Sequence, residues 1–241
     1  PLLRQALEVE RSIVGTDSGG VAAIGDFLGS VLTRMGKYAE AESLHRRSLD
    51  INRRFPGDGT GIIGALKGLV RALVAQGKLD EARLHGKELL ELRRKSADRV
   101  DTDAYRLNCY ARALVTIEPP DLRDLKMGLK VALRASELCT DDYHYNRYTL
   151  ARAYRANGQY ETAAGFLRRA LARVPLEFSE DRQHYEAEMV SILEAEGDLD
   201  AAELVYSDTL ARRRAQFSEG HLDIASSLED LASWMLRHRR Y

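Results

Sequence analysis

The chain has 241 residues, of which 44% are hydrophobic and 30% are charged. Its 36 basic and 37 acidic residues leave a net charge of −1, which argues against nucleic-acid or anionic-membrane binding because both need a basic excess or a basic face. Cys109 and Cys139 are too few for a secreted disulfide framework, and no apolar stretch approaches the roughly 20 residues of a membrane span. We therefore expect a cytoplasmic protein with reduced cysteines.

A short phrase returns at intervals of about 40 residues, or twice that. Its four copies are Gly36–Ala41, Gly77–Ala82, Gly158–Ala163 and Gly197–Ala202. Each copy lies between two apolar runs of helical period, which predicts a helix, a tight turn and a second helix. Since a two-helix unit cannot bury its own apolar face, the units must stack, and the sequence predicts an all-α solenoid of antiparallel helix pairs.

In chain order, the pattern predicts a single array that is incomplete at both ends. It begins with a second helix alone over residues 1–15, continues with helix pairs over residues 20–56, 60–97, 103–140, 144–175 and 181–216, and ends with a first helix alone over residues 221–241. The fourth pair differs, because Pro119-Pro120 interrupts its turn and cannot continue a helix. Small residues are expected where helices approach most closely; these are Gly29, Ala41, Ala82, Ala111, Ala151, Ala163, Ala170 and Ala202.

The fifth pair resembles a tetratricopeptide repeat. The residues at that family's signature spacings are Leu150, Ala151, Tyr154, Gly158, Tyr160, Ala163, Leu167, Ala170 and Pro175. The pairs with a spacing near 42 are similar to the kinesin-light-chain type of this repeat, whose linker resembles Gly220-His221 through Ala225. The resemblance implies a right-handed superhelix whose first helices line a concave groove for peptides or partner proteins, with no cofactor.

Residues of about 105–175 are also similar to repeat tails of bacterial serine/threonine kinases. This second resemblance implies an alternative function, a C-terminal regulatory or interaction region of a bacterial signalling protein. No kinase glycine loop, His-Arg-Asp or Asp-Phe-Gly motif is present in the sequence, so a kinase domain would have to lie outside it.

Patterns that could support catalysis or cofactor binding are weak. Gly59-Thr60-Gly61-Ile62-Ile63-Gly64 matches the dinucleotide fingerprint, but the residues before it are basic and helical in pattern, where a strand would be needed. The six histidines have no metal-ligand spacing, and no serine or cysteine lies in a nucleophile motif. We expect no catalytic residues, no metal and no cofactor in this sequence.

The pattern with functional content lies on the first helix of the central pairs. Aligning these helices on the fifth pair places the following residues toward the groove: Lys67, Arg71, Asn108, Arg112, Tyr148, Arg152 and Arg155. The arginines recur about every 40 residues, so a solenoid would align them as a stripe, and a guanidinium suits a carboxylate ligand. The alternative is that they are ordinary helix-face arginines paired with neighbouring acids.

These observations together predict a non-catalytic scaffold for protein–protein interaction. Its groove would be basic in the middle, because the second pair (Asp26, Ser30) and the sixth pair (Ala187, Ser191, Glu194) lack the arginines. The expected partner is a protein or peptide that is acidic or ends in a free carboxylate, and neither a nucleic acid nor a membrane.

Overall fold

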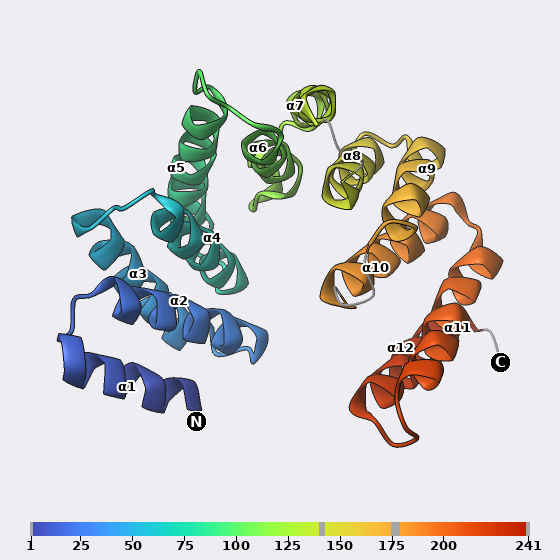
Figure 1. The fold of residues 1–241 in the computed structure, drawn as a ribbon, viewed down its shortest axis with the longest axis horizontal. Coiled ribbons are helices and arrows are strands. Elements are labelled where there is room, and N and C mark those ends of the chain that lie inside the picture. The colour runs from blue at the N-terminus through green and yellow to red at the C-terminus, as the bar shows by residue number, and fades with distance from the viewer. Residues whose placement is uncertain (1, 140–142, 175–178, 240–241) are drawn as a thin grey trace. The chain divides into compact units, whose positions relative to one another are not determined.

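The computed structural model describes residues 2–139, 143–174 and 179–239, and within these ranges it is built from helices without a β-strand (Figure 1). The contacts divide the chain into two compact units, Pro1–Asp124 and Leu125–Tyr241. Unit 1 contains α1 (Leu2–Val14), α2 (Gly19–Arg34), α3 (Tyr38–Arg54), α4 (Thr60–Ala75), α5 (Leu79–Ala97), α6 (Ala104–Thr116) and the 3₁₀-helix η1 (Pro120–Leu122). Unit 2 contains α7 (Leu125–Leu138), α8 (His144–Ala156), α9 (Tyr160–Leu171), α10 (Ser179–Glu196), α11 (Leu199–Gln216) and α12 (Leu222–His238).

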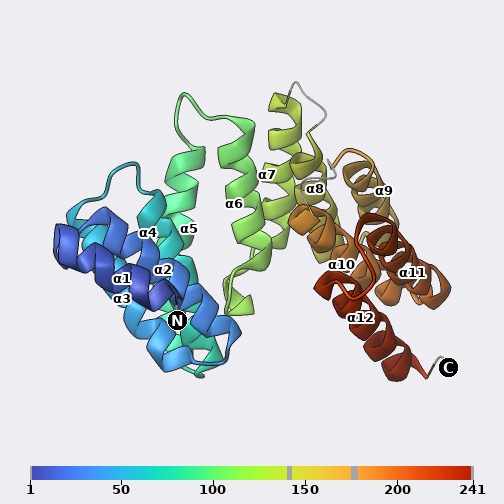
Figure 2. The same ribbon diagram turned by 60° about the horizontal axis from the view of Figure 1, so that its bottom comes forward.

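Consecutive helices pack against each other inside each unit (Figure 2), as the repeated phrase predicts. The prediction of an all-α solenoid of helix pairs is confirmed, and the observed helices end within a few residues of the predicted ones. Pro175, the last residue of the repeat signature, lies outside the described residues.

Glycine explains why every copy of the phrase ends one helix and starts the next. Gly36, Gly77, Gly158 and Gly197 have φ between 75° and 78°, in the left-handed region that a side chain disfavours. After each glycine, the next backbone N–H donates to a carbonyl five residues back, as Lys37 does to Leu32 at 2.9 Å. This pattern closes the helix end and reverses the chain within two residues.

The alanine that closes each phrase is buried between helices. Ala41, Ala82, Ala163 and Ala202 are all 0% exposed. The other small residues predicted at helix contacts are buried as well, as close helix contacts would require. Because protein interiors are close-packed, we expect little room at these positions for a side chain larger than a methyl group.

The fourth pair departs from the pattern because its long turn docks on α5. Leu122 of η1 lies against Gly86, where an added Cβ would come within 2.6 Å of the Leu122 Cδ1. Asp121 accepts a hydrogen bond from Arg83 Nε at 2.9 Å, which holds the same turn from its polar side. Gly86 stands one repeat after His45, so a bulky side chain in one repeat is replaced in the next by space for the turn.

Candidate functional site

The predicted groove residues of unit 1 lie on two first helices. Lys67 and Arg71 are exposed and one turn apart on α4. On α6, Arg112 is half-buried, and Asn108 is 1% exposed and therefore turned away from any ligand on the surface. Of the predicted groove residues of unit 1, Lys67, Arg71 and Arg112 therefore reach the surface, and Asn108 does not.

The predicted groove residues of unit 2 lie on α8 and are engaged inside the protein. Tyr148 is buried and stacks on Tyr185 with ring centroids 4.2 Å apart, and the Arg152 guanidinium lies over the Tyr148 ring at 5.6 Å. Arg152 and Arg155 both form ion pairs with Glu188 of α10. Arg155 Nε lies 2.6 Å and Arg152 Nε 3.5 Å from its carboxylate oxygens.

Glu188 is only 9% exposed, so its charge and the two arginines form a largely internal group that joins neighbouring repeats. For Arg152 and Arg155 the geometry is that of helix-face arginines paired with a neighbouring acid. The predicted stripe also runs from Arg71 and Arg112 in one unit to Arg152 in the other, and its alignment stays a prediction.

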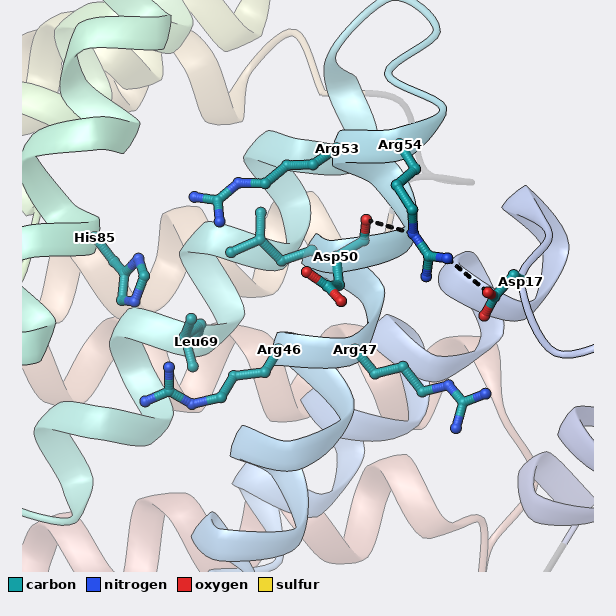
Figure 3. A pocket seen from close by; sticks show the side chains of 9 residues that line it. Asp17, Arg46, Arg47, Asp50, Arg53, Arg54, Leu69 and His85 are labelled. Atoms are coloured by element: carbon teal, nitrogen blue, oxygen red, sulfur yellow. Dashed lines mark hydrogen bonds and ion pairs between the residues drawn. The ribbon is translucent and has the colours of Figure 1, made fainter.

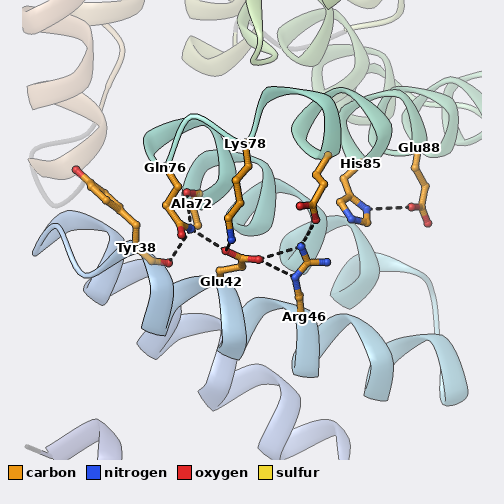
Figure 4. Close-up of polar contacts among 9 residues, drawn as sticks. Tyr38, Glu42, Arg46, Ala72, Gln76, Lys78, His85 and Glu88 are labelled. Atoms are coloured by element: carbon orange, nitrogen blue, oxygen red, sulfur yellow. Dashed lines mark hydrogen bonds and ion pairs between the residues drawn. The ribbon is translucent and has the colours of Figure 1, made fainter.

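The second helices of unit 1 carry a charge network centred on Glu42 of α3 (Figure 4). Its Oε2 accepts from Lys78 Nζ and Gln76 Nε2, both at 2.8 Å, and its Oε1 accepts from Arg46 Nε at 2.9 Å. Arg46 also bonds Glu81 on α5. Side chains from α3, α5 and the turn between α4 and α5 therefore join two consecutive repeats.

This environment shifts the pKa of Glu42. Burial by itself would raise the pKa of the carboxyl group, but the hydrogen bonds from Lys78, Gln76 and Arg46 outweigh it and lower the pKa to about 2. The carboxylate is therefore ionised under all ordinary conditions, and it stabilises the contact between the two repeats.

Four arginines project from α3 around a surface depression of about 460 Å³ (Figure 3). Arg46 and Arg53 point toward α5, and Arg53 Nη2 bonds both Glu88 oxygens at 2.7 and 2.8 Å. Arg47 and Arg54 point the other way; Arg54 bonds Asp17 at 2.7 Å and Arg47 donates to the Thr16 carbonyl. The depression is rich in arginine, but its arginines serve mainly to hold neighbouring segments together.

A histidine–carboxylate pair lies between α2, α3 and α4. His45 is 0% exposed, and its Nδ1 is 2.6 Å from Asp26 Oδ1. The ring fits because two glycines face it: a Cβ at Gly29 would lie 2.8 Å from the ring and one at Gly68 only 2.2 Å. The pair therefore helps to fix how three helices pack. Asp26, a predicted groove position, is bound to His45.

The remaining sequence motifs do not build a site for chemistry. Gly59 is the residue before α4, and the element preceding it is the helix α3, so the Gly59–Gly64 motif lacks the strand that a dinucleotide site requires. Among the described residues, no three His, Cys, Asp or Glu side chains gather in a way that could hold a metal ion. In the same part of the chain, no helix is long and apolar enough to cross a membrane.

Sequence reasoning missed Glu42, Glu188 and the pairing of Asp26 with His45. One signal was available for Glu188, because an acid one repeat beyond the α8 arginines could have been sought as their partner. Such partners lie about one repeat apart in the sequence. The ion pairs that join neighbouring repeats in unit 1 have the same spacing.

Two segments of the chain, residues 21–95 and 148–180, match family models described as tetratricopeptide repeat. These two segments of the chain are tetratricopeptide repeats. Repeat proteins of this family are in general protein-interaction scaffolds without catalytic activity of their own.

Solved structures of similar fold include other tetratricopeptide repeat proteins. TTC0263 of Thermus thermophilus is 22% identical with a TM-score of 0.53, over 89% of this chain and 99% of that one. BtubC (BKLC) from P. vanneervenii is 19% identical with a TM-score of 0.56, over 91% of each chain. A candidate kinesin light chain repeat of Podosopora anserina is 16% identical with a TM-score of 0.46, over 90% and 95%. No curated protein matches this chain in sequence.

Proposed function

We propose that this tetratricopeptide repeat protein is a cytoplasmic scaffold whose first-helix face in unit 1 binds an acidic segment of a partner protein. The contacts would come from Lys67, Arg71 and Arg112, while the rest of the chain holds these helices in place. A preformed surface of this kind concentrates binding energy in a few anchors.

The observation that carries the proposal is the pair of exposed cations on α4. Lys67 and Arg71 are four residues apart, and like charges at this spacing repel by a few tenths of a kcal/mol. Within the described part of the chain, Arg71 has no ion pair, whereas Arg46, Arg53 and Arg54 on α3 are each matched by an acid. A carboxylate from a partner would supply the missing counter-charge.

The test is a pull-down with the recombinant protein, followed by fluorescence anisotropy with the acidic segment of the protein captured. Arg71→Glu is expected to weaken binding at least tenfold. Lys87→Glu is the matched control, because Lys87 is an exposed cation of unit 1 on the second helix α5. Equal affinity of both variants and the parent protein would refute the proposed site.

Two further measurements refine the ligand. Raising the salt concentration from about 50 to about 300 mM should weaken binding, because exposed charges are screened. Comparing peptides with a free and an amidated C-terminus separates recognition of a terminal carboxylate from recognition of acidic side chains.

The alternative, a regulatory repeat region of a bacterial serine/threonine kinase, rests on the sequence similarity of residues 105–175 only. A kinase signature in the coding sequence next to this chain would support it. In that case the groove would bind a segment of its own parent protein, and the Arg71→Glu variant would change the parent's activity.

A further inference from the structure

Three helices of unit 2 enclose a cavity of about 340 Å³. Val190 of α10 and Val205 and Tyr206 of α11 form apolar walls, and Glu186 of α10 and Asp230 of α12 are acids on the lining. The cavity is large enough for one long side chain, with apolar surface for an aliphatic stem and polar groups for a charged end.

Glu186 carries an unused acceptor. The residue is 9% exposed, and its Oε1 lies 2.7 Å from Arg212 Nη2. Its other oxygen, Oε2, has no hydrogen-bond partner among the described residues. This oxygen has less than 1 Å² of exposed surface, so a ligand reaches it only after a small movement of the cavity wall. Because a buried carboxylate oxygen without a donor costs free energy, a donor that reached it would be stabilised there.

Comparison of successive repeats identifies the kind of donor that is missing. Asp230 on α12 stands one repeat after Glu188 on α10, which receives Arg152 and Arg155 from α8. On α10, the residues one repeat after these two arginines are Ser191 and Glu194. The acid is therefore repeated, but its arginine partners are not. Asp230 is exposed, whereas Glu188 is buried, and Asp230 makes no ion pair within the described residues.

The cation already on the cavity wall is occupied. Arg213 is 8% exposed, and its Nη1 donates to Ser227 Oγ at 2.6 Å and to the Asp223 carbonyl at 2.8 Å. These bonds tie α11 to α12. Arg213 raises the local positive potential and would favour an acidic ligand. The experiment must therefore distinguish an acidic from a basic ligand.

We propose that this cavity, the α10–α12 pocket, binds an arginine side chain from a partner protein. The guanidinium would occupy the place beside Asp230 that Arg152 and Arg155 occupy beside Glu188, and it would donate to Asp230 and to Glu186 Oε2. The aliphatic stem would lie on Val190, Val205 and Tyr206. The inference depends on the proposed scaffold function only in taking the ligand to be part of a protein.

The test titrates the whole chain with the peptide acetyl-Gly-Ala-Arg-Ala-Gly-amide. Binding is followed through the methyl NMR signals of Val190 and Val205. The same peptide with citrulline, which keeps the shape and removes the charge, and one with glutamate are the control ligands. Asp230→Asn is the main variant. Asp208→Asn is the control variant, because Asp208 is an exposed acid of α11 that does not line the cavity.

The arginine peptide is expected to shift both valine methyl signals, and Asp230→Asn to weaken its binding about tenfold, while Asp208→Asn leaves it unchanged. Equal binding of the citrulline peptide, or a preference for the glutamate peptide, would overturn the proposal. Binding that is insensitive to Asp230→Asn would do the same. None of these results touches the unit 1 site, which the Arg71→Glu and Lys87→Glu pair tests separately.

Discussion

Substitution of Ala163 by leucine tests the packing argument most directly. Ala163 closes the repeated phrase at the start of α9, is 0% exposed, and belongs to a core cluster with Ala151, Leu167 and Ala170. Leucine adds three carbon atoms at a point where the neighbouring side chains leave no exposed surface.

Two effects of opposite sign compete in this variant. Burying three more carbon groups in a space that could receive them would stabilise the fold by about 2 kcal/mol, at about 0.8 kcal/mol each. In a close-packed interior, the same groups force helices apart and cost about 1–3 kcal/mol beyond that gain. Since Ala151 and Ala170 are also 0% exposed, we expect the second effect to win.

The assay is thermal and urea unfolding followed by circular dichroism, with Ala163→Leu compared with Ala211→Leu on the exposed face of α11. A loss of about 2 kcal/mol lowers the melting temperature by roughly 4–8 °C for a domain of this size. The control should stay within about 0.5 kcal/mol of the parent protein. An unchanged or raised melting temperature for Ala163→Leu would refute the helix register.

Three further predictions concern the turn and the charge pairs. Gly86→Leu should displace the 117–124 turn and lower stability by about 1–3 kcal/mol in urea unfolding, because even its Cβ would lie 3.2 Å from the Glu118 carbonyl oxygen and 2.6 Å from Leu122 Cδ1; parent-like stability would contradict the docking of the turn. The folded-state pKa of Glu42, about 2, lies below the ordinary 4.5, so this carboxylate contributes up to about 3 kcal/mol that is present above pH 4.5 and lost as the pH falls toward 2. Glu42→Gln should flatten that part of the stability–pH curve, and an unaltered curve would argue against the network. Glu188→Ala leaves two arginines without their acid and should cost about 3 kcal/mol in urea unfolding, with Asp208→Ala, an exposed acid, as the control; a loss equal to that of the control would exclude an internal ion group.

The helices and turns follow from local chemistry, and for that reason the sequence predicts them well. Gly36 and Gly77 follow helices in the left-handed conformation, which closes a helix end and which other residues disfavour. The long turn after α6 was also visible from Pro119-Pro120. That this turn docks on Gly86 was not, since the contact joins residues more than 30 positions apart.

For the candidate site, too, the sequence predicts the local features and the tertiary structure decides the contacts between distant residues. The sequence by itself determined that the protein is a stack of helix pairs and that arginines recur on the first helices, because periodicity and residue type are local properties. Only the tertiary structure decided which of these cations have partners. Glu188 pairs with Arg152 and Arg155, and Glu42 pairs with Lys78, because stacking brings together side chains that lie about one repeat apart. Within the described residues, stacking leaves Arg71 and Asp230 without an ion pair, and these are the charges on which the two proposed sites depend.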